Sequence, residues 1–120
     1  MTSRTYPEDS LHMAVAQLLR LVLPADAIWS TIPAGGGGKI RGAKLKKMGY
    51  RPGWPDIEIV WGGRPHYIEL KTLTGVVSPV QRACHKALVR AGALVAVCRS
   101  IPDVEGTLRG WGLTRAREAA

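Results

Sequence analysis

The chain has 120 residues, 46% of them hydrophobic, and its 17 lysines and arginines against 9 acidic residues give a formal net charge of +8. This length predicts a single domain over residues 1–120, whose one core needs no disulfide or structural metal. No apolar run approaches the roughly 18 residues of a membrane-spanning helix, and the N-terminus lacks a secretory signal pattern, so we expect a cytoplasmic protein with no membrane partner. Cys84 and Cys98 each stand alone and fit no zinc spacing, which favours two reduced core residues.

The first half of the chain predicts a helix, a short strand and a long loop. Apolar residues at helical spacing indicate a helix over residues 9–23, which Pro24 ends, and a short strand follows at 27–32. Residues 33–53 are rich in Gly and Lys and indicate a basic loop, with one helical turn around 43–48. A loop this long in a compact domain is usually functional.

The second half predicts a β-hairpin followed by a helix, a strand and a last helix. Strands at 56–61 and 66–71 flank Gly62-Gly63, a strong hairpin signal. The later elements are a helix at 78–91 that Ser78 caps, an apolar strand at 93–98 that we expect to be buried on both faces, and a short helix at 103–108. This order indicates an α/β domain with a small mixed sheet flanked by helices.

Acidic residues are scarce in the middle of this basic chain. Between Ala27 and Pro102 only Asp56, Glu58 and Glu69 are acidic. A basic surface attracts polyanions such as nucleic acid. Carboxylates within that surface repel phosphate unless a cation lies between them, and we expect this cation to be a divalent metal.

The expected hairpin places two of these carboxylates and a lysine on one face. A two-residue turn pairs Trp61 with Arg64 and sets Asp56 opposite Glu69, with Cβ atoms about 4.5–5.5 Å apart, whereas a three-residue turn would separate them. Opposed carboxylates favour a hard cation such as Mg²⁺. Lys71 shares the face of Glu69 and could hold the attacking water or neutralise charge on a phosphate. The alternative is a turn residue at Asp56 and a surface ion pair between Glu69 and Lys71.

These residues form a familiar signature. Pro55-Asp56 followed by Ile68-Glu69-Leu70-Lys71 resembles the PD-(D/E)xK nuclease signature, and residues 51–56 and 78–82 extend the likeness to the VRR-NUC domains of phages and bacteria. The resemblance runs from Glu8 to Trp111 and implies a restriction-endonuclease-like αβββαβ core. It further implies a DNA endonuclease that depends on Mg²⁺ or Mn²⁺, in a bacterial or phage-infected cell.

The resemblance also implies roles for individual residues. Asp56, Glu69 and the backbone carbonyl of Leu70 would bind the metal, and Lys71 would serve the nucleophilic water. Glu8 corresponds to a further active-site glutamate, although Thr5-x-x-Glu8 also fits a capping box.

Three further polar positions each have more than one interpretation. Gln81 corresponds to a catalytic glutamine of the family, although Ser78-x-x-Gln81 also fits a capping box. His12 lies one turn after Glu8 and could hold water, touch phosphate or be a surface residue. Glu58 could be a third acid near the metal, although many relatives have an apolar residue there.

Two groups of basic residues are candidates for binding the DNA backbone. They lie in the Gly-rich segment and on the 78–91 helix, and they are Lys39, Arg41, Lys44, Lys46, Lys47, Arg51, Arg82, Lys86 and Arg90. The run 35–39 is not a P-loop, because Pro33 and Ile40 stand where that loop needs Gly and Ser or Thr, so no nucleotide cofactor is expected.

The stand-alone members that the chain resembles act on branched DNA. They look like Holliday-junction resolvases that work as homodimers, since a four-way junction offers two symmetric strands. Trp29, Tyr50 and Trp54 are candidates for an exposed dimer interface. Two alternatives stay open, a non-catalytic DNA-binding module on a nuclease fold and a nuclease without junction preference.

Overall fold

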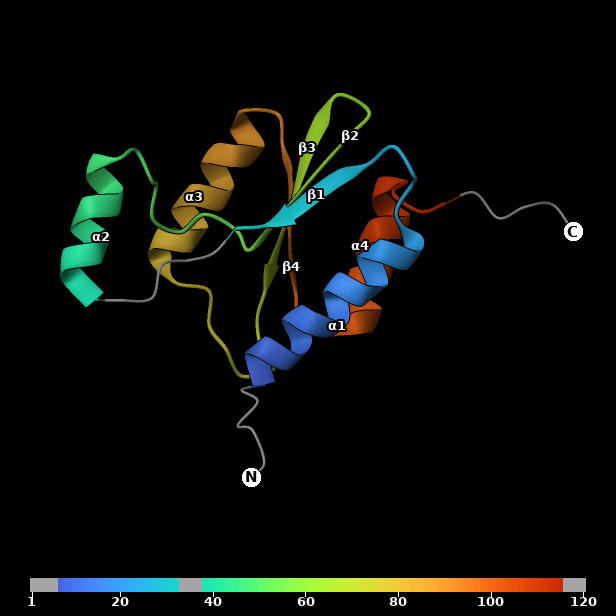
Figure 1. The fold of residues 1–120 in the computed structure, drawn as a ribbon, viewed down its shortest axis with the longest axis horizontal. Coiled ribbons are helices and arrows are strands. Elements are labelled where there is room, and N and C mark those ends of the chain that lie inside the picture. The colour runs from blue at the N-terminus through green and yellow to red at the C-terminus, as the bar shows by residue number, and fades with distance from the viewer. Residues whose placement is uncertain (1–6, 33–37, 116–120) are drawn as a thin grey trace, which may run out of the picture.

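The computed structural model describes residues 7–32 and 38–115, with side chains described from residue 41 onward in the second stretch. Four helices and four strands follow one another along this part of the chain (Figure 1). They are α1 (Pro7–Val22), β1 (Ile28–Thr31), α2 (Gly38–Lys47), β2 (Ile57–Trp61), β3 (Arg64–Leu70), α3 (Pro79–Arg90), β4 (Leu94–Cys98) and α4 (Ile101–Trp111).

The four strands form one mixed sheet in the order β1-β2-β3-β4. The first three strands are antiparallel neighbours, and β4 lies parallel to β3. A parallel pair needs a crossover connection, which α3 provides. The expectation of a small mixed sheet flanked by helices is thus confirmed.

The β2–β3 hairpin has the predicted two-residue turn. Gly62 and Gly63 have φ values of 61° and 73°, which is the positive range that a type I′ turn requires at both central residues. Trp61 therefore pairs with Arg64, and the register runs on to Ile57 opposite Ile68. A one-residue change would have turned every later side chain of β3 to the other face.

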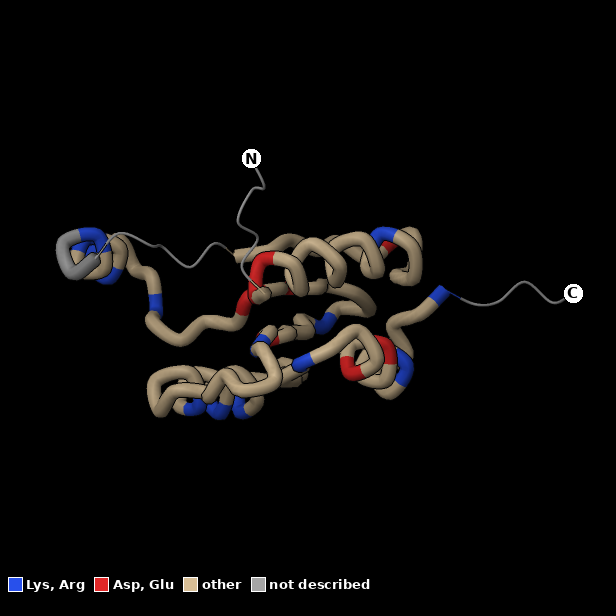
Figure 2. The backbone as a smooth tube through the Cα atoms, turned by 90° about the horizontal axis from the view of Figure 1, so that it is seen from below, with Lys and Arg blue, Asp and Glu red and all other residues tan. Residues whose placement is uncertain are grey.

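Helices cover the two faces of the sheet unequally. On one face, α1 and α4 enclose the main core, which contains the inward side chains of β2 and β3, Ile57, Ile59, Ile68 and Leu70. On the other face, α3 covers a smaller cluster of Tyr67, Cys84, Leu88 and Ala93 (Figures 1 and 2). Cys84 and Cys98 are free and buried in different clusters, which confirms their interpretation as core residues.

Three elements differ from the sequence expectation. The basic segment contains a ten-residue helix, α2, where one helical turn was expected, and α2 stands apart from the sheet beyond α3 (Figure 1). Strand β4 is an edge strand with Val97 38% exposed, so the prediction that it is buried on both faces is wrong. Helix α4 spans 11 residues, longer than the predicted 103–108, because Ser100 caps it through the N–H of Asp103.

The three aromatic residues proposed for a dimer interface are half-buried, not exposed. Trp29 packs against the main core and under the Arg20 guanidinium, 5.7 Å from its ring centroid. Trp54 meets the ring of Tyr67 edge-on at 5.6 Å, and Tyr50 is also half-buried. Among the described helices, none is both long and apolar enough to cross a membrane.

Candidate active site

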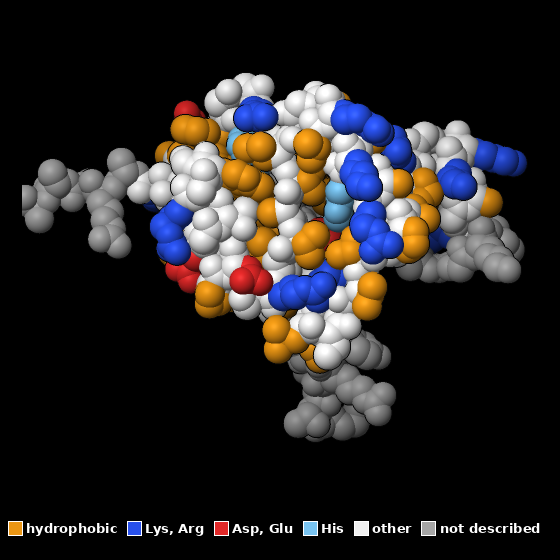
Figure 3. Space-filling view, turned by 180° about the vertical axis from the view of Figure 1, so that it is seen from behind, with side chains coloured by type: hydrophobic (Ala, Val, Ile, Leu, Met, Phe, Trp, Pro, Cys, Tyr) orange, Lys and Arg blue, Asp and Glu red, His pale blue; other side chains and the backbone are white. Residues whose placement is uncertain are grey.

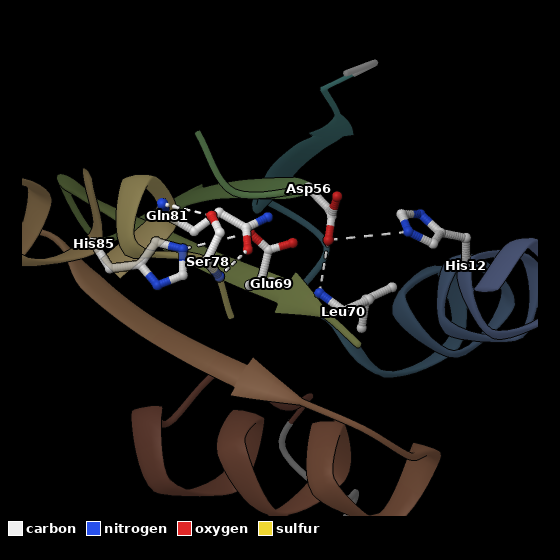
Figure 4. A network of polar contacts seen from close by, with 7 residues as sticks. All are labelled: His12, Asp56, Glu69, Leu70, Ser78, Gln81 and His85. Carbon is white, nitrogen blue, oxygen red and sulfur yellow. Dashed lines mark hydrogen bonds and ion pairs between the residues drawn. The ribbon is translucent and has the colours of Figure 1, made fainter. Parts of the chain in front are cut away.

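The hairpin register brings Asp56 and Glu69 together at the end of the sheet. The register ends at Ile57 opposite Ile68, and the next residues outward are Asp56 and Glu69. The backbone N–H of Leu70 donates to Asp56 Oδ2 at 2.7 Å, which holds the aspartate against β3 (Figure 4). The N–H of Ile32 donates to the Asp56 carbonyl at 2.7 Å, so the backbone of this residue is held from β1 as well.

The carboxyl group of Glu69 is buried, with only 1% of the residue exposed. Burial, followed by the hydrogen bond and charge of Asp56, raises the pKa of Glu69 to about 9, while the Lys71 ammonium lowers this pKa and the Glu8 charge raises it. Oε1 of Glu69 has no hydrogen-bond partner among the described residues. Glu69 therefore keeps its proton at neutral pH in the metal-free protein, and a nearby cation would favour its ionised form.

Lys71 follows β3 and is held at the same end of the sheet. Its backbone N–H donates to the Cys98 carbonyl at 3.0 Å, which continues the pairing with β4 past Leu70. Its side chain is half-buried, and its charge acts on Glu69 and His85. The side chain of Leu70 points into the main core, so only the backbone of Leu70 faces the site.

Helix α1 forms the outer wall of a cleft of about 690 Å³ beside Asp56. Glu8, exposed in the first turn of α1, and His12 line this cleft. His12 Nε2 lies 4.0 Å from Asp56 Oδ2 (Figure 4). The structure thus places Glu8 and His12 on the side of the site where Asp56 opens to solvent. Thr5, the other half of the possible capping box, lies outside the described residues.

The two remaining polar candidates lie elsewhere around the site. Gln81 completes a capping box, since its Oε1 accepts from the Ser78 N–H at 3.0 Å and its own N–H donates to Ser78 Oγ at 3.1 Å. The capping alternative is therefore confirmed, and the catalytic role of Gln81 stays a prediction. Glu58 lies beside Tyr67, whose pKa is raised by burial and then by Glu58. Glu58 is absent from the groups that shift the pKa of Glu69.

His85 is a site residue that the sequence interpretation missed. Its Nε2 lies 3.4 Å from Glu69 Oε1, and neither atom makes a hydrogen bond of good geometry with the described residues (Figure 4). Burial, then the Lys71 charge, lowers the pKa of His85, whereas Asp56 raises it. The available signal was its spacing, because four residues after Gln81 is the same face of α3.

The segment before Asp56 packs directly on α3. Gly53 has a φ of 85°, and a Cβ there would lie 2.6 Å from the Val80 carbonyl oxygen. Pro55 is fully buried between this contact and Asp56. This close approach fixes α3, and with it His85, relative to the strand end that carries Asp56.

The basic candidates form two groups on the side of the molecule that carries α3 (Figures 2 and 3). All the members whose side chains the structure describes are exposed. They are Arg41, Lys44, Lys46, Lys47, Arg51, Arg82, Lys86 and Arg90. The side chain of Lys39 lies outside the described residues. Arg99 has a structural task instead, because its Nη1 donates to the carbonyls of Thr72 at 2.7 Å and Gly75 at 2.6 Å and so holds the loop after Lys71.

The residues present fit a hard divalent cation. Within the described ranges, no three His, Cys, Asp or Glu side chains are grouped closely enough to enclose a metal by themselves. Mg²⁺ needs only one or two carboxylates and completes its shell with water and phosphate oxygens. Asp56 and Glu69 are two adjoining carboxyl groups, and burial and Asp56 raise the pKa of Glu69, so a divalent cation beside them would favour the ionised pair.

A mixed sheet whose hairpin carries an aspartate opposite a glutamate-x-lysine end is a nuclease-type fold of the PD-(D/E)xK class. The chain belongs to the VRR-NUC domain family, whose model matches residues 18–102. A solved structure described as a VRR_NUC domain protein is similar at a TM-score of 0.70 and 19% identity, covering 95% of this chain and 100% of that one. This likeness shows the fold alone. No curated protein sequence matches significantly.

The family match confirms the resemblance inferred from the sequence, and it includes Asp56, Glu69 and Lys71. It begins at residue 18 and therefore excludes Glu8 and His12. Members of this nuclease family generally use divalent metals and act on DNA. The individual roles of the site residues stay predictions.

Proposed function

We propose that this protein is an endonuclease that hydrolyses DNA phosphodiester bonds with Mg²⁺ or Mn²⁺, and that it prefers branched DNA such as four-way junctions. The observation that carries the proposal is the pairing of Asp56, which lines a cleft, with the buried Glu69, whose pKa the Lys71 charge lowers. A buried carboxyl group beside a second one is costly in a purely structural arrangement, which favours a functional reason for the presence of Glu69.

Asp56, Glu69 and the Leu70 carbonyl would hold the metal, with Glu8 close by. A divalent ion bound there supplies charge that stabilises the phosphate oxygens and lowers the pKa of water. Asp56 is pre-positioned for this task, because the Leu70 N–H fixes its Oδ2 at 2.7 Å. Lys71 would orient the attacking water from the Glu69 side, and its ammonium would balance the negative charge that develops on the phosphate.

The cations of α2 and α3 would bind the DNA backbone on the α3 side of the site (Figure 2). Contacts to phosphate position a duplex without reading its sequence, so we expect recognition by shape. A second copy of the chain would supply the second active site that symmetric cleavage of a junction needs. We place the protein in the cytoplasm, where Cys84 and Cys98 stay reduced.

The test compares linear, flap and four-way DNA with Mg²⁺, with Mn²⁺ and with EDTA. The proposal predicts cleavage that either metal supports and EDTA abolishes, fastest on the four-way substrate. Asp56→Asn is the inactive variant, and its matched control is Asp26→Asn, an exposed aspartate that accepts from Trp61 Nε1 at 3.0 Å. Binding without cleavage would identify a non-catalytic DNA-binding module, and equal rates on all shapes would identify a nuclease without junction preference. Light scattering on the free protein tests the dimer.

A further inference from the structure

We propose that His85 is a positioning residue that donates a hydrogen bond from Nε2 to Oε1 of Glu69 and fixes the orientation of this carboxylate. The inference rests on the proposed function, in which Glu69 binds a metal. It starts from a contact of 3.4 Å between two buried atoms that have no other partner among the described residues. An imidazole N–H is a donor that an otherwise unsatisfied carboxylate oxygen needs, since a buried acceptor without a partner costs about 1–3 kcal/mol.

The position of α3 orients the His85 side chain toward Glu69. The capping box of Ser78 and Gln81 fixes the start of α3, and Gly53 sets its distance from the neighbouring loop. Cys84 and Leu88 pack the inner side of α3 against Tyr67 of the sheet. The His85 side chain is 12% exposed and that of Glu69 is 2% exposed, so water has little access to the contact.

Behind His85 lies an open groove of about 430 Å³ between α3 and β4. Val89, Val95 and Val97 line it, together with Lys86 and Arg90. The imidazole thus separates this groove from the carboxyl pair. In Figure 4 the His85 ring approaches Glu69 from α3, whereas Asp56 approaches from β2.

The consequence concerns the two oxygens of Glu69. With Oε1 held by His85, the carboxyl plane is fixed and Oε2 stays available to the metal beside Asp56. Carboxylate ligands are usually held in this way by a partner that does not touch the metal, and loss of such a partner typically lowers metal affinity about 10–100-fold. His85 would then act through Glu69, without contact with substrate or metal.

Two variants separate this role from simple packing. His85→Leu removes the donor and keeps an apolar side chain in the space, whereas His85→Gln keeps an N–H donor. His66→Gln is the matched control, because His66 is also buried but lies on the opposite face, with Nδ1 3.3 Å from the Ile59 carbonyl. The readouts are Mn²⁺ affinity of the DNA-free protein by titration calorimetry, thermal melting without metal, and cleavage across a range of Mn²⁺ concentrations.

We expect His85→Leu to weaken Mn²⁺ binding about 10–100-fold, and His85→Gln to restore most of that affinity. Cleavage by His85→Leu should recover at saturating Mn²⁺, so that the apparent metal constant changes more than the maximal rate. His66→Gln should lower the melting temperature and leave Mn²⁺ affinity unchanged.

Wild-type Mn²⁺ affinity in His85→Leu would overturn the inference. A loss of Mn²⁺ affinity in His85→Gln as large as that in His85→Leu would also overturn it, because His85 would then be a metal ligand itself.

If His85→Leu does not fold, the tautomer of the His85 imidazole in the wild type tests the proposal instead. Long-range ¹H–¹⁵N spectra of the wild type must place the His85 proton on Nε2, and a proton on Nδ1 alone would overturn the proposal. A wild type that binds no Mn²⁺ and cuts no DNA would instead reject the proposed function.

Discussion

The two faces of the sheet bury polar groups in different ways. On the α1 and α4 face, His66 is 4% exposed, yet its ring has a backbone carbonyl at 3.3 Å and packs 5.3 Å from the ring of Trp111. On the α3 face, Glu69 is buried beside the carboxyl group of Asp56, and its Oε1 lies 3.4 Å from His85 Nε2. The first arrangement joins an imidazole ring to a backbone acceptor, whereas the second holds two acidic groups side by side.

This difference suggests a division of labour. The α1 and α4 face carries most of the apolar burial and should supply most of the stability. The α3 face has a small apolar cluster and bears the cost of a buried carboxyl pair. A charge held against its own solvation is typical of a functional site. Five experiments test this division, beginning with the largest expected effect.

Loss of either Asp56 or Lys71 should abolish activity without unfolding the protein. Asp56→Asn and Lys71→Ala should each lower the cleavage rate by roughly 10³-fold or more, because both groups act where charge develops. Their melting temperatures should stay close to wild type, since the main core is untouched. Single-turnover cleavage and thermal melting give both readouts. Cleavage within tenfold of wild type by either variant would reject the site assignment.

The same truncation on the two faces should have unequal costs. Leu108→Ala on α4 empties a site that is 0% exposed and should lower the free energy of unfolding by about 3–5 kcal/mol, whereas Leu88→Ala on α3, at 9% exposed, should cost about 1–3 kcal/mol. Urea denaturation of both variants, with wild type as the reference, measures the difference. Equal losses would show that the α3 face contributes as much stability as the main core.

The buried glutamate should make the metal-free protein less stable as the pH rises. The pKa of Glu69 is about 9 in the folded chain against a usual value of 4.5, so the native state holds the extra proton between these pH values. The free energy of unfolding should therefore fall through this window, by up to about 1.4 kcal/mol per pH unit.

Glu69→Gln should remove this slope and melt at a higher temperature than wild type at pH 8 without metal. Added Mn²⁺ should raise the melting temperature of the wild type, and increasingly so at higher pH, because binding displaces the proton. The variant should show little response to the metal. A flat pH profile in the metal-free wild type would contradict the raised pKa of Glu69.

Glu8 should matter for cleavage and little for stability. Glu8→Gln should lower the rate by about tenfold or more if α1 contributes this carboxylate to the metal, a loss of about 1.4 kcal/mol. Asp9→Asn removes a charge from the same helical turn and controls for the effect on the helix. If Glu8→Gln lowers only the melting temperature, by the ~1 kcal/mol of a lost cap, the structural interpretation of Glu8 is correct.

The last test concerns the cations of α2, whose loss should change DNA affinity but neither the chemical step nor the stability of the fold. With roughly five phosphate contacts, metal-free affinity for duplex DNA should fall by hundreds-fold between about 50 and 200 mM salt, at about −0.9 in log affinity per contact. Replacing Lys44, Lys46 and Lys47 together by Ala should flatten this slope and weaken binding to all DNA shapes equally. Arg109→Ala on α4 is the control. An unchanged slope in the triple variant would move the DNA path to the basic side of α3.

The parts of the fold that local chemistry determines were predictable from the sequence. Gly62-Gly63 fixed the turn length, and the turn length fixed the register that brings Asp56 to Glu69. Ser78 and Pro79 marked the start of α3 in the same way. The proximity of the two carboxyl groups was therefore a matter of counting along two strands.

Features that depend on packing between distant segments were not predictable. The apolar residues of β4 do not indicate that this strand pairs with only one other strand. The glycines in and before α2 favour a loop, although the structure has a helix of ten residues there. The approach of His85 to Glu69 depends on how closely α3 lies on the sheet, which no local pattern encodes. The burial of Trp29 and Trp54 was missed for the same reason.

The close approach of Gly53 to the Val80 carbonyl also predicts the effect of inherited mutations at position 53. Every amino-acid replacement at position 53 adds at least a Cβ, which would lie 2.6 Å from that oxygen on a backbone with a φ of 85°. The helix and the loop would have to separate, and His85 and Asp56 belong to these two parts. A missense allele at this codon should therefore yield a folded protein that loses function on mild warming. The added side-chain atoms would push α3 away from the segment that carries Asp56 and so disturb the active site.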